Sequence, residues 1–361
     1  MLKSLPFIID SHLDLSMNAM EWNRDLRLPV ADINQREKYL TDKPDRAKST
    51  VSLAELRKGN IGLVVATQIA RYVAPGNLLP GWFSPQQAWA QTQAQLAWYK
   101  AMEEEGEMVM ITDKNALEKH LSLWMNDEPS VNKPVGYILS LEGADSLITV
   151  HHLERAYRYG LRAVGPAHYG LGRYANGTDA YGHLTQQGRE LLAEMERLNM
   201  ILDVTHLCDD AFWDALSIYK GHIWASHHNC RALVNHNRQL SDDMILALAE
   251  RNAVIGVAFD AWMLVPNWVR GISIPQSMGC YLSTVTEHID HICQLTGNTL
   301  HAAIGSDLDG AFGREQCPAD LESIADIPLL ANLLLNKGYS NNDVDNIFQC
   351  NWLRFLKNAW Q

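Results

Sequence analysis

The feature that most restricts the fold of this chain is a regular alternation of short apolar runs with amphipathic segments. Eight apolar runs are candidate strands: 6–10, 61–69, 135–143, 161–169, 200–206, 222–228, 253–259 and 301–307. Segments with helical periodicity lie between most of them, such as 84–106, 185–199, 208–220 and 241–252. Near-continuous apolar strands that alternate with helices indicate a parallel sheet buried on both faces. Eight such units predict an α/β fold, a (β/α)₈ TIM-type barrel, as a single domain over residues 1–361.

Composition excludes several classes of protein. The net charge of −12 argues against nucleic acid as a partner, because phosphate neutralisation needs basic patches. No run reaches the ~18 consecutive apolar residues of a membrane helix, and the N-terminus has no apolar signal-peptide region, so we expect no membrane association. The six cysteines stand singly, which favours a reducing, cytoplasmic location. No glycine-rich phosphate motif follows the first strand, which argues against a dinucleotide-binding fold.

Three long connections are expected to carry functional loops. The charged stretch 23–50 reads as an extended loop after the first strand. Loops 70–84 and 260–280 are rich in glycine, proline and tryptophan, so they are candidate lids over a pocket. Their tryptophans, Trp82, Trp262 and Trp268, would line that pocket, or would pack in the core or at a subunit interface.

Acidic and histidine side chains stand where six of the eight predicted strands end. In chain order they are His12 and Asp14, Glu142, His168, His206, His227 and Asp307. The active sites of (β/α)₈ barrels form at these carboxyl ends. A single histidine after a strand is usually only a hydrogen-bonding residue, but six independent accidents at one face of a barrel are much less plausible. The set as a whole therefore predicts a catalytic site.

The residue types in this set indicate a metal site. Imidazole and carboxylate ligands without cysteine suit Zn²⁺ or a similar divalent ion at an open catalytic site. Five candidate ligands are too many for one tetrahedral ion with an open position, so we expect two ions bridged by a carboxylate and a hydroxide. Asp10, His12 and Asp14 alternate in "DSHLD" and would share one strand face, where one cation binds His12 and Asp14. Asp10 is expected to support these ligands from outside the metal shell.

At this point the sequence resembles the membrane (renal) dipeptidase family, peptidase family M19, whose members are amidohydrolase-like zinc barrels. The resemblance covers nearly the whole chain. It rests on five motifs in order, which are "DSHLD", "SLEGADSL", "DVTHLCDDAFWDAL", "ASHHNCRALVNHNRQLSDDMILALAERNAVIGV" and "IGSDLDG". It implies a metallo-dependent hydrolase fold and two Zn²⁺ ions per chain. His12 and Asp14 would hold one ion, His206 and His227 the other, and Glu142 would bridge them.

The resemblance also implies roles for three further residues. Asp307 would be the general acid/base, taking a proton from the bridging water and passing it to the leaving amine. His168 would polarise the scissile carbonyl or its oxyanion, and Arg238 would bind the terminal carboxylate of the substrate. The expected activity is metal-dependent hydrolysis of dipeptides by a metal-bridging hydroxide, with a D-residue tolerated at the C-terminal position, in a cytoplasmic enzyme that could form a homodimer.

Two alternatives to a dipeptidase stay open. A barrel of the same type could act on N-acyl amino acids, lactams or lactones, and a non-hydrolytic biosynthetic relative is the other candidate. The chain departs from the usual family pattern at Ala167, in the turn "YGLGRYANG", and at His228 and Asn229, which puts substrate preference in doubt. Within the altered turn, Arg173 would either read an acidic substrate side chain, or be solvated or paired with Asp179. His228 is expected to be structural.

Overall fold

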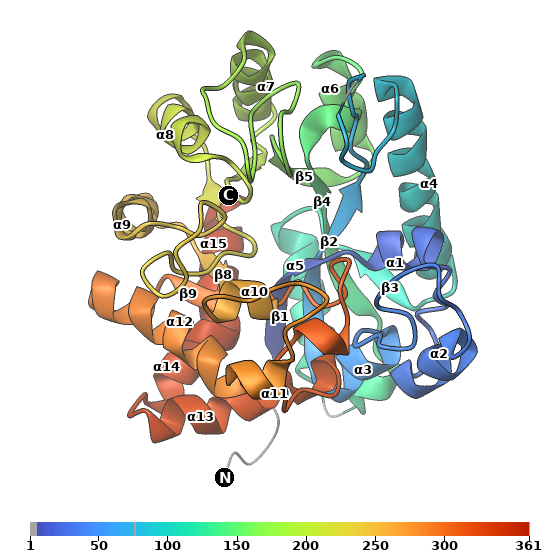
Figure 1. Cartoon of the computed structure of the whole chain (residues 1–361), viewed down its shortest axis with the longest axis vertical. Helices are drawn as coiled ribbons and strands as arrows, with labels where there is room; N and C mark the ends of the chain where they lie inside the picture. Colours follow the sequence, from blue (N-terminus) through green and yellow to red (C-terminus); the bar gives the residue numbers. More distant parts are fainter. Residues whose placement is uncertain (1–5, 76, 127, 361) are drawn as a thin grey trace.

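A curled sheet of parallel strands forms the centre of the molecule, and helices surround it (Figure 1). The computed structural model describes residues 6–75, 77–126 and 128–360. The strands are β1 (Ile8–Leu13), β2 (Ile61–Ile69), β3 (Met108–Met110), β4 (Val135–Glu142), β5 (Leu161–Gly165), β6 (Ile201–Asp203), β7 (Ile223–Trp224), β8 (Ile255–Val257) and β9 (Ala302–Ile304).

The α-helices are α1 (Leu15–Glu21), α2 (Val30–Glu37), α3 (Leu53–Lys58), α4 (Pro85–Glu104), α5 (Lys114–Trp124), α6 (His151–Arg158), α7 (Gln186–Arg197), α8 (Asp209–Ile218), α9 (Asp242–Glu250), α10 (Ala261–Leu264), α11 (Pro275–Met278), α12 (Leu282–Thr296), α13 (Leu330–Asn336), α14 (Asn341–Asp345) and α15 (Asn351–Ala359). Shorter helical turns are η1 (Ser130–Asn132), η2 (Ala144–Ser146), η3 (Arg314–Gln316), η4 (Ile324–Leu329) and the π-helical η5 (Asn346–Cys350). Within the described residues, no helix combines the length and the apolar character that crossing a bilayer requires.

The strands follow one another around the curled sheet in chain order. They pair in parallel in the order β1-β2-β4-β5-β6-β7, and β8 pairs with β9. One bridge, Ala225 with Ile255, joins the end of β7 to β8. On the other side, the Asp307 amide donates to the His12 carbonyl at 3.2 Å, so the segment after β9 lies beside β1. The predicted α/β barrel class is therefore confirmed, with regular pairing interrupted at these two places.

All eight predicted strands are present, and one strand was missed. Strand β3 has three residues and pairs with β4, and so short an apolar run cannot be recognised in the sequence. The four helices named from periodicity are confirmed as α4, α7, α8 and α9. Three of them begin where a side chain caps the first turn: Ser84, Thr185 and Ser241 each accept a hydrogen bond from the amide three residues later.

Two clusters of apolar side chains form the core, one inside the barrel and one between the sheet and the surrounding helices. Alternate strand residues point into the barrel near its bottom and pack against α15, in a cluster that includes Ile9, Leu63, Ile138, Ala163, Ile201, Trp224, Ala303, Trp352 and Phe355. The rings of Trp224 and Trp352 lie 5.6 Å apart. The outward strand residues join the larger core under the surrounding helices. Because the bottom is filled with apolar side chains, the polar carboxyl ends of the strands face the opposite, open end.

The predicted loop 23–50 carries more structure than expected. It contains α2, and the buried guanidinium of Arg24 binds it to the rest of the barrel. Arg24 donates to Glu37 at 2.9 Å and to Asp45 at 3.0 Å, and lies 3.4 Å from Asp309 in the loop after β9. This segment is thus held both by buried ion pairs and by apolar side chains, since Leu26 and Ile33 belong to the hydrophobic core.

Candidate metal centre

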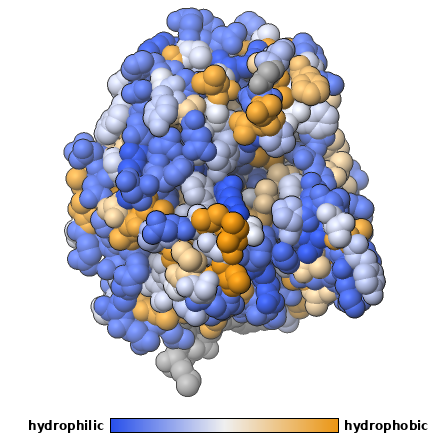
Figure 2. Space-filling model, in the orientation of Figure 1, coloured by the Kyte–Doolittle hydropathy of each residue, from blue (hydrophilic) through white to orange (hydrophobic). Residues whose placement is uncertain are grey.

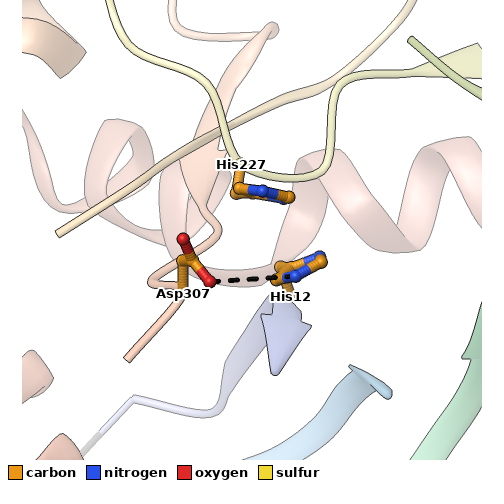
Figure 3. Close-up of side chains that lie close together, drawn as sticks. All are labelled: His12, His227 and Asp307. Carbon is orange, nitrogen blue, oxygen red and sulfur yellow. Dashed lines mark ion pairs between the residues drawn. The ribbon is translucent and has the colours of Figure 1, made fainter. Parts of the chain in front are cut away.

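Six of the predicted site residues come together at the carboxyl ends of the strands. His12 belongs to β1 and Asp14 follows it, Glu142 ends β4, and His206, His227 and Asp307 are each the third residue after β6, β7 and β9. All are buried except Asp307, whose side chain is 14% exposed. In Figure 3 the Asp307 carboxylate is turned toward His12, and the rings of His12 and His227 lie 3.6 Å apart.

Glu142 lies between two groups of possible ligands. Its Oε2 is 3.4 Å from Nε2 of His12. Its Oε1 is 3.1 Å from Nε2 of His206 and 3.4 Å from Nε2 of His227. The carboxylate therefore presents one oxygen to each group, which is the arrangement of a bridging ligand.

The ligand atoms converge closely enough to hold cations. His12, Asp14 and Glu142 form one compact group, and Glu142, His206 and His227 form another. Nε2 of His12 and Oε2 of Glu142 are buried and have no hydrogen-bond partner. Buried polar atoms are rarely left unpaired, and these two face one another across the place where a cation would sit. Imidazole and carboxylate donors fit a divalent ion such as Zn²⁺.

Contacts outside this set fix the orientation of the ligands. The Thr178 hydroxyl lies 2.9 Å from Nδ1 of His206, and the Ser226 hydroxyl lies 2.9 Å from Nδ1 of His227. Each contact leaves Nε2 directed at the centre. The Thr67 hydroxyl donates to Asp14. Such contacts set the tautomer and the direction of a ligating ring.

Asp10 contacts the site through the backbone and not through the side chain of a ligand. Its Oδ1 accepts from the backbone amide of His12 at 3.2 Å and from that of Ser306 at 2.8 Å. It therefore holds the backbone of β1 to the segment after β9. The alternation in "DSHLD" indicated that Asp10 lies on the same strand face as His12 and Asp14. Its hydrogen bond with the Ser306 amide could not be predicted, because it depends on how the segment after β9 packs beside β1.

Two site residues have backbone conformations that side chains disfavour. His206 has φ of 69° and Asp307 has φ of 57°, both in the left-handed region. Strained backbone of this kind persists where the surrounding structure holds it, and it is common at active sites. The sharp turns bring both side chains back over the ends of β6 and β9.

The electrostatics of the site favour a bound cation. Burial disfavours a charged imidazole at His12, yet the surrounding carboxylates, Glu142 foremost, raise the pKa of His12 to about 10. Burial and then Glu142 raise the pKa of Asp14 to about 7. Burial also raises the pKa of Asp307 well above its usual range, and lowers the pKa values of His206 and His227. The raised pKa values of His12, Asp14 and Asp307 show that the crowded carboxylates favour a positive charge among them, which a bound cation would supply.

A pocket of about 1580 Å³ opens above these residues. Figure 2 shows it as a hollow near the middle of this face. His168 and Arg238 both line it, and Nε2 of His168 lies 3.8 Å from Oε1 of Glu142. Loops 70–84 and 260–280 contribute to its walls, including the three tryptophans Trp82, Trp262 and Trp268. Their interpretation as pocket walls is confirmed.

Several polar lining residues were not singled out in the sequence, among them Arg71, Tyr169, Asp260 and Arg270. Arg71 is the second residue after β2, and its Nη2 lies 2.5 Å from Nδ1 of His168. Arg270 lies 3.6 Å from Asp260 and over the Trp262 ring. The only signal available was position, because Arg71, Tyr169 and Asp260 lie shortly after the ends of β2, β5 and β8. Arg270 lies in the middle of loop 260–280 and carried no such signal.

Arg173 is not among the residues that line the pocket. Its guanidinium donates to three backbone carbonyls, those of Asp145, Leu147 and Ile148, at 3.3, 2.6 and 3.1 Å. The pairing with Asp179 is not found, since Asp179 instead lies 3.5 Å from His236. The carbonyl contacts leave Arg173 partly exposed but do not support its reading of an acidic substrate side chain. His228 is buried with Nδ1 3.4 Å from Nη1 of Arg238, a position that agrees with the expected structural role.

Comparison with known proteins agrees with the geometry. The family model described as membrane dipeptidase (peptidase family M19) matches residues 1–361. An uncharacterized protein in the pqqA 5′ region of Klebsiella pneumoniae is 31% identical over 239 residues, which cover 64% of this chain and 84% of that protein. The dipeptidase tcpJ of Claviceps purpurea is 28% identical over 62% of this chain, and the match spans only 51% of that relative.

Solved structures share the fold. The dipeptidase AC, a metallopeptidase of family M19, superposes with a TM-score of 0.76 at 22% identity, with 99% of each chain covered. A metallopeptidase from Rhodobacter sphaeroides, liganded with a phosphinate mimic of the dipeptide L-Ala-D-Ala, superposes with a TM-score of 0.75 at 21% identity over 99% of this chain and 100% of that one. With the family model matched from end to end and the ligand set assembled at the strand ends, the chain belongs to the membrane dipeptidase family, peptidase family M19.

Proposed function

We propose that this metal-dependent dipeptidase holds two Zn²⁺ ions per chain, with His12 and Asp14 on one side of Glu142 and His206 and His227 on the other. The observation that supports the proposal is the position of Glu142 between the two groups. Its Oε2 and Nε2 of His12 lie 3.4 Å apart, and neither atom has a hydrogen-bond partner. When bound, the ions supply a Lewis acid and lower the pKa of water to about 7.

The residues around this centre have complementary roles in amide hydrolysis. Asp307 is partly exposed to the pocket and lies 3.8 Å from His12, so it accepts a proton at the metal centre and passes it to the leaving amine. Burial and then the nearby charges of Arg71 and Arg238 lower the pKa of His168 to about 3, so its ring is neutral. Its Nε2 faces the centre, where it donates to the oxygen of the scissile carbonyl.

Arg238 would bind the free carboxylate at the C-terminus of the dipeptide. It lines the pocket, and Nη2 is held by the His227 carbonyl at 2.9 Å, which fixes the guanidinium beside a metal ligand. A site that binds the terminal carboxylate and the scissile carbonyl of a dipeptide places few constraints on the configuration of the Cα atom between them. We therefore retain tolerance of a D-residue at the C-terminal position.

Three proposals concern the whole protein. Residues 1–361 are proposed to form one domain, since the strands close around one site. A cytoplasmic location is proposed from the free cysteines, and a homodimer is the proposed assembly.

The test is metal analysis of the purified protein together with turnover of L-Ala-L-Ala and L-Ala-D-Ala. We expect about two divalent ions per chain, loss of turnover on chelation and recovery on adding Zn²⁺. An N-acetylated amino acid and a lactone serve as control substrates. Full turnover of a dipeptide by metal-free protein would refute the metal centre, and turnover of the control substrates alone would refute the dipeptidase assignment for this chain.

A further inference from the structure

Arg71 lines the pocket, and no carboxylate among the residues that the structure describes forms an ion pair with it. Its Nη2 lies 2.5 Å from Nδ1 of His168, and its Nη1 donates to the Pro80 carbonyl at 2.9 Å. Its Nε is buried without a hydrogen-bond partner. The carboxylates that act on it most, Glu142 and Asp145, form no ion pair with it among the described residues. Glu142 faces the metal ligands and Asp145 accepts from the amide of Arg173.

The other arginines around the pocket divide into two kinds. Arg270 lies 3.6 Å from Asp260, and Arg314 forms an ion pair with Glu322. Arg238 resembles Arg71, because its recorded partners are the His227 carbonyl and the His228 ring. Within the described part of the chain, two guanidinium groups of the pocket therefore have no carboxylate partner. A dipeptide has only one obligatory carboxylate, and Arg238 is the proposed partner for it.

Arg71 and Arg238 approach the site from different strands. Arg71 follows β2 and touches His168, whereas Arg238 belongs to the segment after β7 and touches the backbone of His227. Burial lowers the pKa of Arg71, because a positive charge is less stable away from water. An anion bound in the pocket would stabilise that charge. A planar guanidinium is well suited to pair with a carboxylate.

We propose that Arg71 binds a carboxylate on a substrate side chain, so that dipeptides containing Asp or Glu are the preferred substrate class. The proposal rests on the dipeptidase function proposed above. Recognition of an acidic substrate side chain was considered for Arg173 in the sequence. The guanidinium of Arg173 is bound to backbone carbonyls, and we assign this role to Arg71 instead.

The test compares acidic substrates with their isosteric amides. We would measure kcat/KM for L-Glu-L-Ala against L-Gln-L-Ala, and for L-Ala-L-Glu against L-Ala-L-Gln. The native enzyme should favour Glu over Gln in at least one pair by about tenfold or more, as expected for a hydrogen bond between charged groups. The pair that shows the preference identifies which substrate residue reaches Arg71. Arg71→Met should bring that ratio to about one, and Arg71→Lys should leave an intermediate ratio because it keeps a point charge.

Two further variants separate this effect from general electrostatics. Arg314→Met removes the same charge from the pocket wall, but its guanidinium is paired with Glu322, so the Glu/Gln ratio should stay native. Arg238→Met should lower the preference for a free C-terminus over its amide while the Glu/Gln ratio persists. Loss of the free-terminus preference in Arg71→Met, instead of the side-chain preference, would overturn the proposal.

Equal turnover of Glu and Gln substrates by the native enzyme would also overturn it, as would an unchanged ratio in Arg71→Met. If contact with His168 makes Arg71→Met inactive, calorimetric binding of phosphinate analogues of the same pairs replaces turnover and is judged by the same ratio. Hydrolysis of L-Ala-L-Ala with no Glu preference would refute the role of Arg71 alone. Failure to hydrolyse any dipeptide would refute the dipeptidase proposal and this one with it.

Discussion

Replacing Asp309 by asparagine tests how firmly the loop after β9 is held to the first long loop of the chain. Oδ1 of Asp309 accepts from the Thr50 amide at 2.8 Å and from its hydroxyl at 2.6 Å. Oδ2 accepts from the Ser49 hydroxyl at 2.6 Å and the Val51 amide at 3.2 Å, and Arg24 lies 3.4 Å away. Asparagine keeps the shape but turns one oxygen into an NH₂ group, which can only donate.

Either orientation of the asparagine therefore loses the bonds on one side. Two hydrogen bonds to a charged, buried group disappear, and each is worth about 1.5–3 kcal/mol, so unfolding should become easier by about 3–6 kcal/mol. Arg24 keeps Glu37 and Asp45 as partners, so the guanidinium is not left uncompensated. With an unfolding entropy of ~2.1 cal/mol/K per residue over this chain, the melting temperature should fall by about 4–8 °C.

The assay is thermal unfolding of the metal-loaded protein followed by circular dichroism, with urea unfolding as a second probe. The matched control is Asp42→Asn, the same change in the same loop at a side chain that is 57% exposed and paired with Arg46. That variant should change the melting temperature much less, because solvent screens an exposed ion pair. If Asp309→Asn melts no lower than Asp42→Asn, the buried network does not stabilise the loop and the reasoning is wrong.

The remaining predictions concern the metal centre and substrate binding. Asp307→Asn should keep the metal ions and lower kcat by about 10²–10⁴-fold, as loss of a proton shuttle does; near-native turnover in a metal-loaded sample would exclude that role. Arg238→Met should raise KM strongly and abolish the preference for a free C-terminal carboxylate, measured on dipeptides and their amides, and an unchanged preference would assign the terminus to another group. His206→Ala should lose one ion and most activity by metal analysis and turnover, and two retained ions would contradict its role as a ligand. Thr178→Val removes the hydroxyl at Nδ1 of His206 and should weaken metal affinity by about 10–100-fold in a chelator titration, with native affinity counting against its positioning role.

Much of the fold and the candidate site could be predicted because the relevant patterns are local. Strands β2 and β4 are buried along nearly their whole length, which is why their apolar runs were recognised to within one residue of their ends. Parallel strands place their carboxyl ends on one face, so Glu142 and His206 could be placed together without knowledge of any contact. The three-residue strand β3 shows the limit, since its pairing with β4 decides its conformation.

What the sequence by itself determined is the order of the strands, the burial of the sheet and the residue types that end each strand. Only the tertiary structure decided how those side chains are used. Arg71 and Arg173 both lie in loops that follow strands, and nothing in their local sequence distinguishes them; one faces the pocket and the other binds carbonyls because of how the loops pack. Likewise, Asp309 meets Thr50 across 259 residues of chain. Periodicity encodes which face of an element is buried, whereas the partner of a polar side chain depends on which distant backbone the closed barrel brings beside it.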